Sequence, residues 1–327
     1  MVNLKIIDSK ALIDNIEKYK SKKICAMVKS NAYGHGLKEI VKIADDYVDY
    51  FGVVNLEEAL VVRKLSDKPI LICAKTFDFK KCKKNDIEVM VDNEEDLLEA
   101  IRCKNKIHLK INCGMNRFGC KSKLELVQIN KILENLSVEL KYIYTHFANS
   151  ENARKTKKDY EQFLKLRSYI SQSAPHCLGG SKIFDYDFDC EMIRLGIAMY
   201  GYGQNVRPVE KITSFVSKVF FAKKGEKIGY SGDYKVTRDG YFAIVPVGYG
   251  DGLRRCLSGG FCVKIKNKEY PCVGRICMDA FFVKIDDTIK IGDEVVIFDD
   301  ARDISKDTIV YEVLTGFSNF RGKTLLV

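Results

Sequence analysis

The sequence predicts an α/β protein in which a (β/α)8 TIM-type barrel is followed by a mostly β-strand domain. First, about eight short apolar runs alternate with helical patterns over roughly the first 200 residues, which is the order expected of a closed parallel barrel. Second, helical periodicity largely vanishes after Gly201, where short strands are separated by Gly and Asp turns. We therefore expect a barrel in residues 1–210 and a β domain in residues 211–327.

The expected barrel strands are apolar runs of strand length, and the segments between several of them have helical spacing. The expected strands are residues 25–29, 50–54, 70–73, 89–91, 107–111, 142–146, 176–178 and 193–197. The expected helices are residues 8–20, 56–65, 94–102, 122–135 and 157–171. Residues 179–189 are loop-like, so the last strand–helix units are the least regular.

The β domain shows no internal repeat. Its expected strands are residues 214–219, 241–246, 261–265 and 294–298, and only residues 306–315 have a helical pattern.

Composition favours a cytosolic globular protein. Hydrophobic residues make up 46% and charged residues 30% of the 327 residues, which is ordinary. The first residues carry acids and no secretory apolar region, and no stretch reaches the roughly 20 apolar residues that span a bilayer. The twelve cysteines are scattered without a Cys-x-x-Cys pair, so we expect reduced core residues.

The net charge of +10 does not by itself indicate nucleic-acid binding. The lysine runs at residues 20–23 and 80–84 are short and lack interleaved aromatic residues. A solvated lysine-rich surface is therefore the favoured interpretation.

The chemistry is expected to centre on the run Val-Lys-Ser-Asn-Ala-Tyr-Gly-His-Gly that begins at Val28. Lys29 sits where a strand ends, and active sites of parallel α/β proteins gather at that end. Tyr33 and the two glycines follow, and glycines let the backbone approach a ligand closely. The pattern suggests an aldehyde cofactor held by Lys29 as a Schiff base. A surface lysine before a Gly-rich turn is the alternative for Lys29 taken alone.

These nine residues closely resemble the pyridoxal-phosphate lysine motif of the alanine racemase family. Further segments resemble family motifs in the family's order. They are Lys110–Gly119, the strand end at His146, the run that begins at Arg194, the segment 228–234 around Tyr230, the segment 274–279, and 309–313 around Tyr311. The resemblance spans nearly the whole chain and implies pyridoxal 5′-phosphate as cofactor, a barrel plus a β domain, and alanine as substrate.

Inverting a stereocentre without a moving base needs one base on each face of the planar intermediate. Lys29 supplies one, and the resemblance implies that Tyr230 supplies the other; taken alone, Tyr230 would be a hairpin-turn tyrosine. In the family, residues matching Arg194 and His146 link the cofactor's pyridine nitrogen to that tyrosine, although a strand-end histidine alone is more often structural. Because arginine only donates hydrogen bonds, the ring nitrogen should stay unprotonated, which disfavours transamination.

The remaining site residues are also implied by the resemblance. Tyr33, Tyr311 and the peptide groups of Gly196 and Ile197 match phosphate contacts. Gly179-Gly180-Ser181 replaces the usual Asn-Ser pair, with Ser181 a candidate substitute.

Arg117 matches the arginine that orients the substrate carboxylate, and Lys110 matches a lysine that is carbamylated in many members. Asn112 and Cys113 replace the usual Asp and Thr, so the local hydrogen bonding should differ. Met278 and Asp279 match residues that reach the other subunit's pocket, which implies a head-to-tail homodimer with shared sites.

Several competing functions stay open. The aromatic residues Tyr33 and Tyr311 would leave room for little beyond a methyl group, which favours alanine, but a broader racemase that accepts serine is an alternative. So is a pyridoxal-phosphate-dependent decarboxylase of basic amino acids, or a non-catalytic pyridoxal-phosphate-binding protein. For a bacterial owner, the family implies D-alanine supply for cell-wall peptidoglycan. We expect no metal, nucleic acid or membrane partner.

Overall fold

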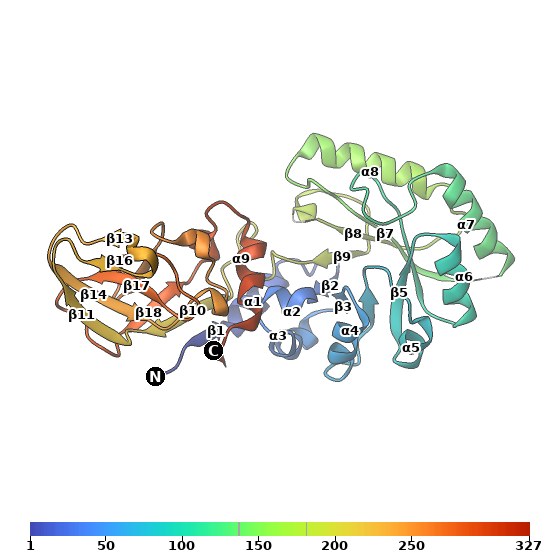
Figure 1. Ribbon diagram of the computed structural model, residues 1–327. Coiled ribbons are helices and arrows are strands. Elements are labelled where there is room, and N and C mark those ends of the chain that lie inside the picture. Colours follow the sequence, from blue (N-terminus) through green and yellow to red (C-terminus); the bar gives the residue numbers. More distant parts are fainter. Residues whose placement is uncertain (137, 181) are drawn as a thin grey trace. The chain divides into compact units, whose positions relative to one another are not determined.

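A computed structural model describes residues 1–136, 138–180 and 182–327 (Figure 1). The described chain forms two compact units. One contains residues 12–32 and 37–206 and is called the barrel unit. The other contains residues 1–11, 33–36 and 207–327 and is called the strand unit.

The barrel unit contains, within the described residues, a closed barrel of eight strands, each parallel to the next. The strands are β2 (Lys23–Met27), β3 (Tyr50–Val53), β4 (Ile70–Ile72), β5 (Ile87–Val91), β6 (Ile107–Lys110), β7 (Leu140–His146), β8 (His176–Gly179) and β9 (Met192–Leu195). Pairing of β2 with β9 closes the ring. The predicted barrel is confirmed, and each predicted strand overlaps an observed one.

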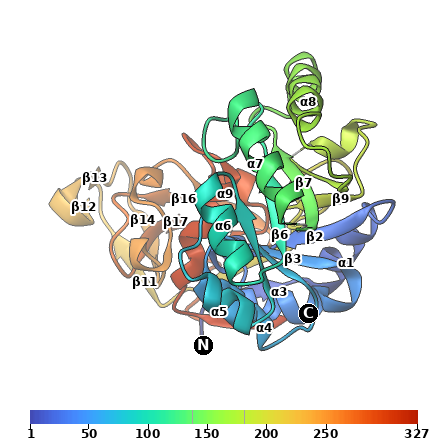
Figure 2. The same ribbon diagram turned by 90° about the vertical axis from the view of Figure 1, so that its right-hand side faces the viewer.

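Helices follow most of these strands and cover the outside of the barrel (Figure 2). They are α3 (Leu37–Ala44), α4 (Leu56–Arg63), α5 (Phe79–Lys84), α6 (Glu94–Arg102), α7 (Lys123–Asn135) and α8 (Ala153–Arg167). Side-chain caps begin several of them; Ser122 and Glu125 form a capping box at α7. Between β8 and β9 the described chain has only the 3-10 turn Ile183–Asp185, as the loop-like pattern predicts.

The lysine-rich run at 80–84 belongs to helix α5. Asp78 accepts a hydrogen bond from the Lys81 amide and caps the helix, while Phe79 and Cys82 are buried. Lysines in the last turn face the negative end of the helix dipole. The run therefore has a structural role in the barrel layer.

The interior of the barrel is polar along two neighbouring strands. Side chains alternate along a strand, so His108 and Lys110 of β6 share the inner face with Tyr144 and His146 of β7. His108 Nε2 lies 2.5 Å from a carboxylate oxygen of Glu88, and both side chains are buried. This alternation brings Lys110 and His146 to the carboxyl end of the barrel.

The strand unit is built on a nine-stranded sheet within the described residues, in the order β11-β14-β17-β16-β15-β18-β10-β1-β19. The strands are β1 (Leu4–Ile7), β10 (Glu210–Phe215), β11 (Lys218–Ala222), β14 (Gly240–Val245), β15 (Cys262–Ile265), β16 (Lys268–Val273), β17 (Phe281–Ile285), β18 (Glu294–Phe298) and β19 (Lys323–Leu326). A small ribbon pairs β12 (Lys227–Ile228) with β13 (Tyr234–Lys235), and α9 spans Val310–Gly316. Phe242, Val273 and Ile228 belong to its core.

The amino end differs from the expected division at residue 210. Strand β1 pairs antiparallel with β10 and parallel with β19, so residues 1–11 belong to the strand unit. Helix α1 (Ser9–Glu17) begins where this strand ends. The partners of β1 lie roughly 200 and 320 residues away, which is why a local pattern does not reveal the pairing.

The expected continuous strand at 214–219 is wrong. The Val216 amide donates to the Asp293 carbonyl, and the Ser217 amide to the Ile244 carbonyl. The chain therefore leaves its partner β18 at this point and pairs with β14 as β11.

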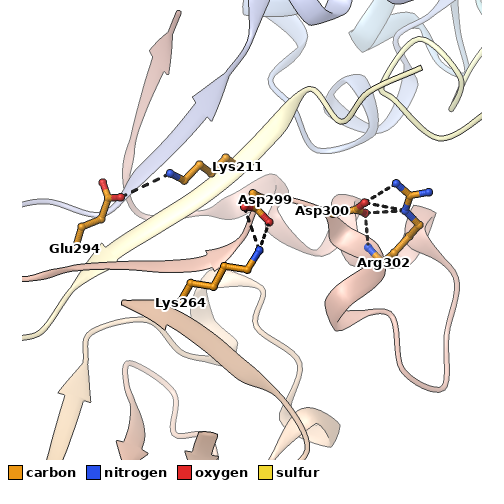
Figure 3. Close-up of polar contacts among 6 residues, drawn as sticks. All are labelled: Lys211, Lys264, Glu294, Asp299, Asp300 and Arg302. Atoms are coloured by element: carbon orange, nitrogen blue, oxygen red, sulfur yellow. Dashed lines mark hydrogen bonds and ion pairs between the residues drawn. The ribbon is translucent and has the colours of Figure 1, made fainter. Parts of the chain in front are cut away.

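Several ion pairs lie on the surface of the strand unit (Figure 3). Lys211 Nζ lies 3.6 Å from Glu294, and Lys264 Nζ lies 3.0 Å from Asp299. These groups are exposed, so each pair contributes roughly 1 kcal/mol or less to stability.

No helix in the described part of the chain is long and apolar enough to cross a membrane.

Candidate active site

Lys29 begins a left-handed turn at the carboxyl end of β2. The next residues, Ser30, Asn31 and Ala32, have φ of 54°, 53° and 53°. A non-glycine residue in this region costs about 1–2 kcal/mol, and such strain persists where the surroundings enforce it. Strain of this kind makes the segment a candidate functional element.

Contacts within the barrel unit hold this turn. The Glu58 carboxylate of α4 accepts hydrogen bonds from the Ser30 amide at 2.7 Å and the Val54 amide at 3.1 Å. The Asn31 side chain accepts from the Leu37 amide at 2.8 Å and begins α3. Sequence reasoning missed Glu58. The Asn55-x-x-Glu58 capping pattern marks a helix start, but it does not indicate a remote partner.

The barrel unit brings together the predicted basic residues. Burial, followed by the positive charges of Arg194, Arg117, Lys110 and Lys29, lowers the pKa of His146 to about 3. Burial also lowers the pKa of Lys29, and the nearby Arg117 and Arg194 contribute. This mutual influence places these side chains in one electropositive site suited to an anionic ligand.

Arg194 is fixed inside the barrel. Its guanidinium donates to the Thr145 carbonyl at 2.5 Å and the Cys177 carbonyl at 3.2 Å, and lies 4.6 Å from the centre of the Tyr144 ring. A Cβ on Gly179 would lie 2.4 Å from its Nη2 atom. Glycine at 179 therefore makes room for the arginine.

Lys110 lies over aromatic rings. Its ammonium is 5.2 Å from the centre of the Phe118 ring and 5.5 Å from that of Tyr144. Burial and the neighbouring Arg194 lower the pKa of Lys110 to about 8. Near pH 8 a sizeable fraction of the Lys110 side chains is therefore neutral.

The loop after Lys110 uses the residues that replace the family's Asp and Thr. The Asn112 side chain accepts hydrogen bonds from the Gly114 and Asn116 amides at 3.2 and 3.0 Å. The Cys113 thiol lies 3.0 Å from the Thr145 hydroxyl, which donates to the Ile111 carbonyl. These bonds shape the loop that carries the exposed Arg117.

Gly196 and Ile197 follow β9 directly. Their carbonyls accept hydrogen bonds from the Met199 and Tyr200 amides at 3.0 and 3.1 Å, which makes a tight turn at the barrel's carboxyl end. Ser181, the candidate phosphate residue, lies outside the described residues.

The strand unit places Tyr33 beside Tyr311. Their ring centres are 6.0 Å apart, and Tyr33 is buried. Gly34 adopts φ of +90°, and a Cβ there would lie 2.0 Å from the Leu314 carbonyl oxygen of α9. The glycine after Tyr33 therefore permits close packing on α9.

Tyr230 is 66% exposed on the strand unit. It stands in a turn between Gly229 and Ser231, both with positive φ. The Asp233 carboxylate accepts hydrogen bonds from Arg275, so the segments 228–234 and 274–279 meet.

Met278 is exposed beside Asp279, whose carboxylate lies 2.7 Å from Arg321. Arg321 also pairs with the buried Asp251 at 2.7 Å. Gly248 has no room for a side chain against the Cys277 and Met278 carbonyls. The strand unit thus presents Tyr230 and Met278 on segments that are fixed by backbone packing and ion pairs.

Two family models match consecutive parts of the chain. The alanine racemase N-terminal domain matches residues 7–204, and the alanine racemase C-terminal domain matches residues 209–323. The chain belongs to the alanine racemase family. Its members are pyridoxal-phosphate-dependent isomerases, which confirms the predicted enzyme class and cofactor.

Individual members of the family agree with this assignment. The chain is 34% identical to the alanine racemase of Borreliella burgdorferi, over 87% of this chain and 84% of that one. The crystal structure of the E. faecalis alanine racemase has a TM-score of 0.94 at 26% identity and covers 99% of this chain and 98% of that one. A histidine racemase from Leuconostoc mesenteroides shares the fold, with a TM-score of 0.90 at 21% identity over 99% and 98% of the two chains.

The side chains present fit the family's cofactor. An aldehyde needs an amine whose neutral form is accessible, and the pKa of Lys29 is lowered by its burial. An anionic phosphate and a phenolic oxygen need donors and positive charge. Within the barrel unit the cluster around Arg194 supplies positive charge, and within the strand unit Tyr33 and Tyr311 are neighbouring hydroxyl-bearing side chains. The donor set contains no group of three or more metal-ligating side chains within the described residues.

Removing His146 is expected to flatten the acid sensitivity of the cofactor-free protein. The unfolded chain takes up this proton near pH 6.5 and the folded chain only near 3, so stability is full above pH 6.5 and is lost as the pH falls. The group contributes a slope of roughly 1.4 kcal/mol per pH unit in that window. Urea unfolding of His146→Asn between pH 4 and 7 should lack this slope, whereas His176→Asn should keep it; an unchanged slope in His146→Asn contradicts the assignment.

Proposed function

We propose that this chain interconverts L-alanine and D-alanine with pyridoxal 5′-phosphate, using Lys29 and Tyr230 as the two bases. The observation that carries the proposal is the strained, tightly held turn that presents Lys29 to an electropositive barrel mouth. The cofactor, when bound, draws electron density away from the Cα–H bond of an amino acid. Binding, orientation and proton transfer fall to the residues of the chain.

Lys29 would hold the cofactor covalently and serve as one proton acceptor. Its lowered pKa increases the neutral fraction of the amine, which is the form that attacks an aldehyde and accepts a proton. The Glu58 contacts to Ser30 limit the freedom of the segment that carries the amine, so it stays in position between turnovers.

Tyr230 would be the base for the other face. Its side chain is largely exposed on the strand unit and so is accessible to a ligand or a second subunit. Arg194 would face the ring nitrogen and, having only donors, keep it unprotonated. His146, neutral because its pKa is near 3, can both donate and accept and so can pass a hydrogen bond toward the tyrosine.

Phosphate binding is assigned to Tyr33, Tyr311 and the Gly196–Ile197 peptide groups, with Ser181 as a further candidate donor. Arg117 would bind the substrate carboxylate. Near pH 8 Lys110 is partly neutral, and a neutral amine can add carbon dioxide to form a carbamate with release of a proton. Carbamylated Lys110 would then counterbalance the nearby arginines.

We also propose a head-to-tail homodimer in the cytosol. Tyr230 and Met278 are both exposed, as expected of residues that, with Asp279, complete the partner's pocket. All twelve cysteines lie in the described residues and are free, which suits a reducing compartment.

Mixing two inactive variants tests the shared site. If Lys29 and Tyr230 meet across the dimer, exchange of subunits between Lys29→Ala and Tyr230→Phe proteins makes about half of the dimers mixed, each with one intact site of two. The mixture should regain about a quarter of wild-type activity. Recovery should fail if either variant is replaced by the Lys29→Ala/Tyr230→Phe double variant; no recovery in the first mixture would exclude a shared site.

Circular dichroism of L-alanine incubated with the cofactor-loaded protein tests the reaction. The signal should decay to zero from either enantiomer, because the two have equal free energy. Alanine should show a higher kcat/KM than serine, histidine or lysine, and comparable values for lysine would refute the small-pocket argument. Carbon dioxide release from ornithine, lysine or diaminopimelate without racemisation would indicate a decarboxylase, and cofactor binding with neither reaction would indicate a carrier.

A further inference from the structure

The ammonium group of Lys5 is buried in the strand unit. The residue lies on β1 and is only 4% exposed. Its Nζ atom donates hydrogen bonds to the Gly34 carbonyl at 2.5 Å and to the Phe317 carbonyl at 2.8 Å. Lysine is almost never fully buried without a partner, so this placement needs a reason.

Glu210 is the acidic partner of this ammonium group. Burial raises the pKa of its carboxyl to about 7, so the compensating charge is present above that pH. Glu210 lies on β10, the neighbour of β1, is 1% exposed, and places a carboxylate oxygen 3.8 Å from Lys5 Nζ. Among the described residues neither of its oxygens has a hydrogen-bond partner. Its role is therefore electrostatic, whereas Lys5 makes the directed bonds.

The carbonyls that Lys5 binds belong to the two segments that carry the paired tyrosines. Gly34 directly follows Tyr33, and it is held between Lys5 and the Leu314 carbonyl of α9. Phe317 follows α9, the helix that carries Tyr311. One ammonium group thus joins the end of the Lys29 turn to the end of the Tyr311 helix.

Tyr33 needs such an anchor. Its φ is +54°, a left-handed conformation that a bulky residue rarely adopts. Strain of this kind persists only where the surroundings enforce it. The hydrogen bond from Lys5 to the Gly34 carbonyl and the packing of Gly34 on α9 hold Tyr33 in this conformation.

We propose that Lys5 is a positioning residue that holds Tyr33 and Tyr311 at the separation required to bind the cofactor phosphate, with Glu210 as its counter-charge. The inference rests on the phosphate role given to these tyrosines in the proposed function. A buried ion pair is often no more stabilising than an apolar pair of similar size. An apolar pair has no donors for the Gly34 and Phe317 carbonyls. The ammonium group therefore acts by fixing the positions of these two carbonyls through its hydrogen bonds.

The double variant Lys5→Met/Glu210→Met separates positioning from stability. It removes both charges at similar volume, so it should still fold, with a melting temperature a few degrees below that of the wild type because the two carbonyls lose their donor. Its dissociation constant for pyridoxal 5′-phosphate, measured by absorbance titration of the cofactor-free protein, should rise by about 10- to 100-fold. Its affinity for pyridoxal, which lacks the phosphate, should change by less than about twofold.

Glu210→Gln is the matched control. It removes the counter-charge but keeps the donors of Lys5, so it should bind pyridoxal phosphate within about threefold of the wild type. If the double methionine variant does not fold, Lys5→Met/Glu210→Gln takes its place, because it also lacks the ammonium and retains a polar group at 210.

Equal affinity of the wild type and the variants lacking Lys5 for pyridoxal phosphate would overturn the proposal. The proposal would also be overturned if the variants lacking Lys5 lost as much affinity for pyridoxal as for pyridoxal phosphate. The same holds if Glu210→Gln lost as much affinity for pyridoxal phosphate as they do. A wild type that binds pyridoxal phosphate no more tightly than pyridoxal would also overturn it. A wild type that prefers the phosphorylated cofactor but racemises no amino acid would refute the proposed reaction alone, and the comparison between variants would still decide the role of Lys5.

Discussion

Lys29→Ala is expected to abolish both covalent cofactor attachment and racemisation. The variant lacks the amine that bonds to the aldehyde and also one of the two proposed bases, so no second group restores either step. Borohydride reduction followed by peptide mass spectrometry should place the cofactor on the peptide containing Lys29 in the wild type and nowhere in the variant. Circular dichroism of L-alanine should show no decay.

Lys38→Ala provides the control for this prediction. Lys38 is an exposed lysine of α3, close in sequence and outside the proposed site. It should attach cofactor and racemise alanine as the wild type does. Cofactor fixed to another lysine in Lys29→Ala, with activity retained, would refute the assignment of Lys29.

Tyr230→Phe is expected to lower racemisation by about a thousandfold, within the range for loss of a general acid–base group. The phenylalanine keeps the ring and removes the hydroxyl that takes or returns the proton on one face. The loss should be directional: abstraction of the α-hydrogen should fail most severely from L-alanine, while exchange from D-alanine through Lys29 persists. Exchange of each enantiomer in deuterated water, followed by nuclear magnetic resonance, measures the two faces separately.

Tyr241→Phe is the matched control for this substitution. Tyr241 is another exposed tyrosine of the strand unit, on β14, and its ring packs against Phe221. Its loss should leave both exchange rates unchanged. Near wild-type racemisation in both directions by Tyr230→Phe would exclude the two-base assignment.

The barrel could be predicted from the sequence because most of its strands are short runs of buried, largely apolar residues. Strands of a parallel barrel read as apolar runs, and the helices between them carry their own caps, such as Ser122 with Glu125. The site residues at strand ends follow from the same pattern: His146 closes β7 and Lys29 comes just after β2. Topology alone sends such residues to the carboxyl end of the barrel.

Long-range pairing decided what the local pattern could not. Strand β1 belongs to the sheet of the strand unit because its partners come from the far end of the chain. The break between β10 and β11 follows a change of partner strand, which leaves no mark on the residues themselves.

The sequence by itself determined which chemical groups lie around Lys29. The tertiary structure decided their backbone conformation, their burial and their pKa values. Residue type indicates an amine at a strand end, but Ser30 and Ala32 have no intrinsic preference for the left-handed region; Glu58 and the packing of the barrel unit impose it. Likewise, nothing local shows that Lys5 binds the carbonyl of Gly34. Propensity and periodicity act between neighbours in the chain, whereas strain, burial and shifted pKa values arise only when distant residues are brought together.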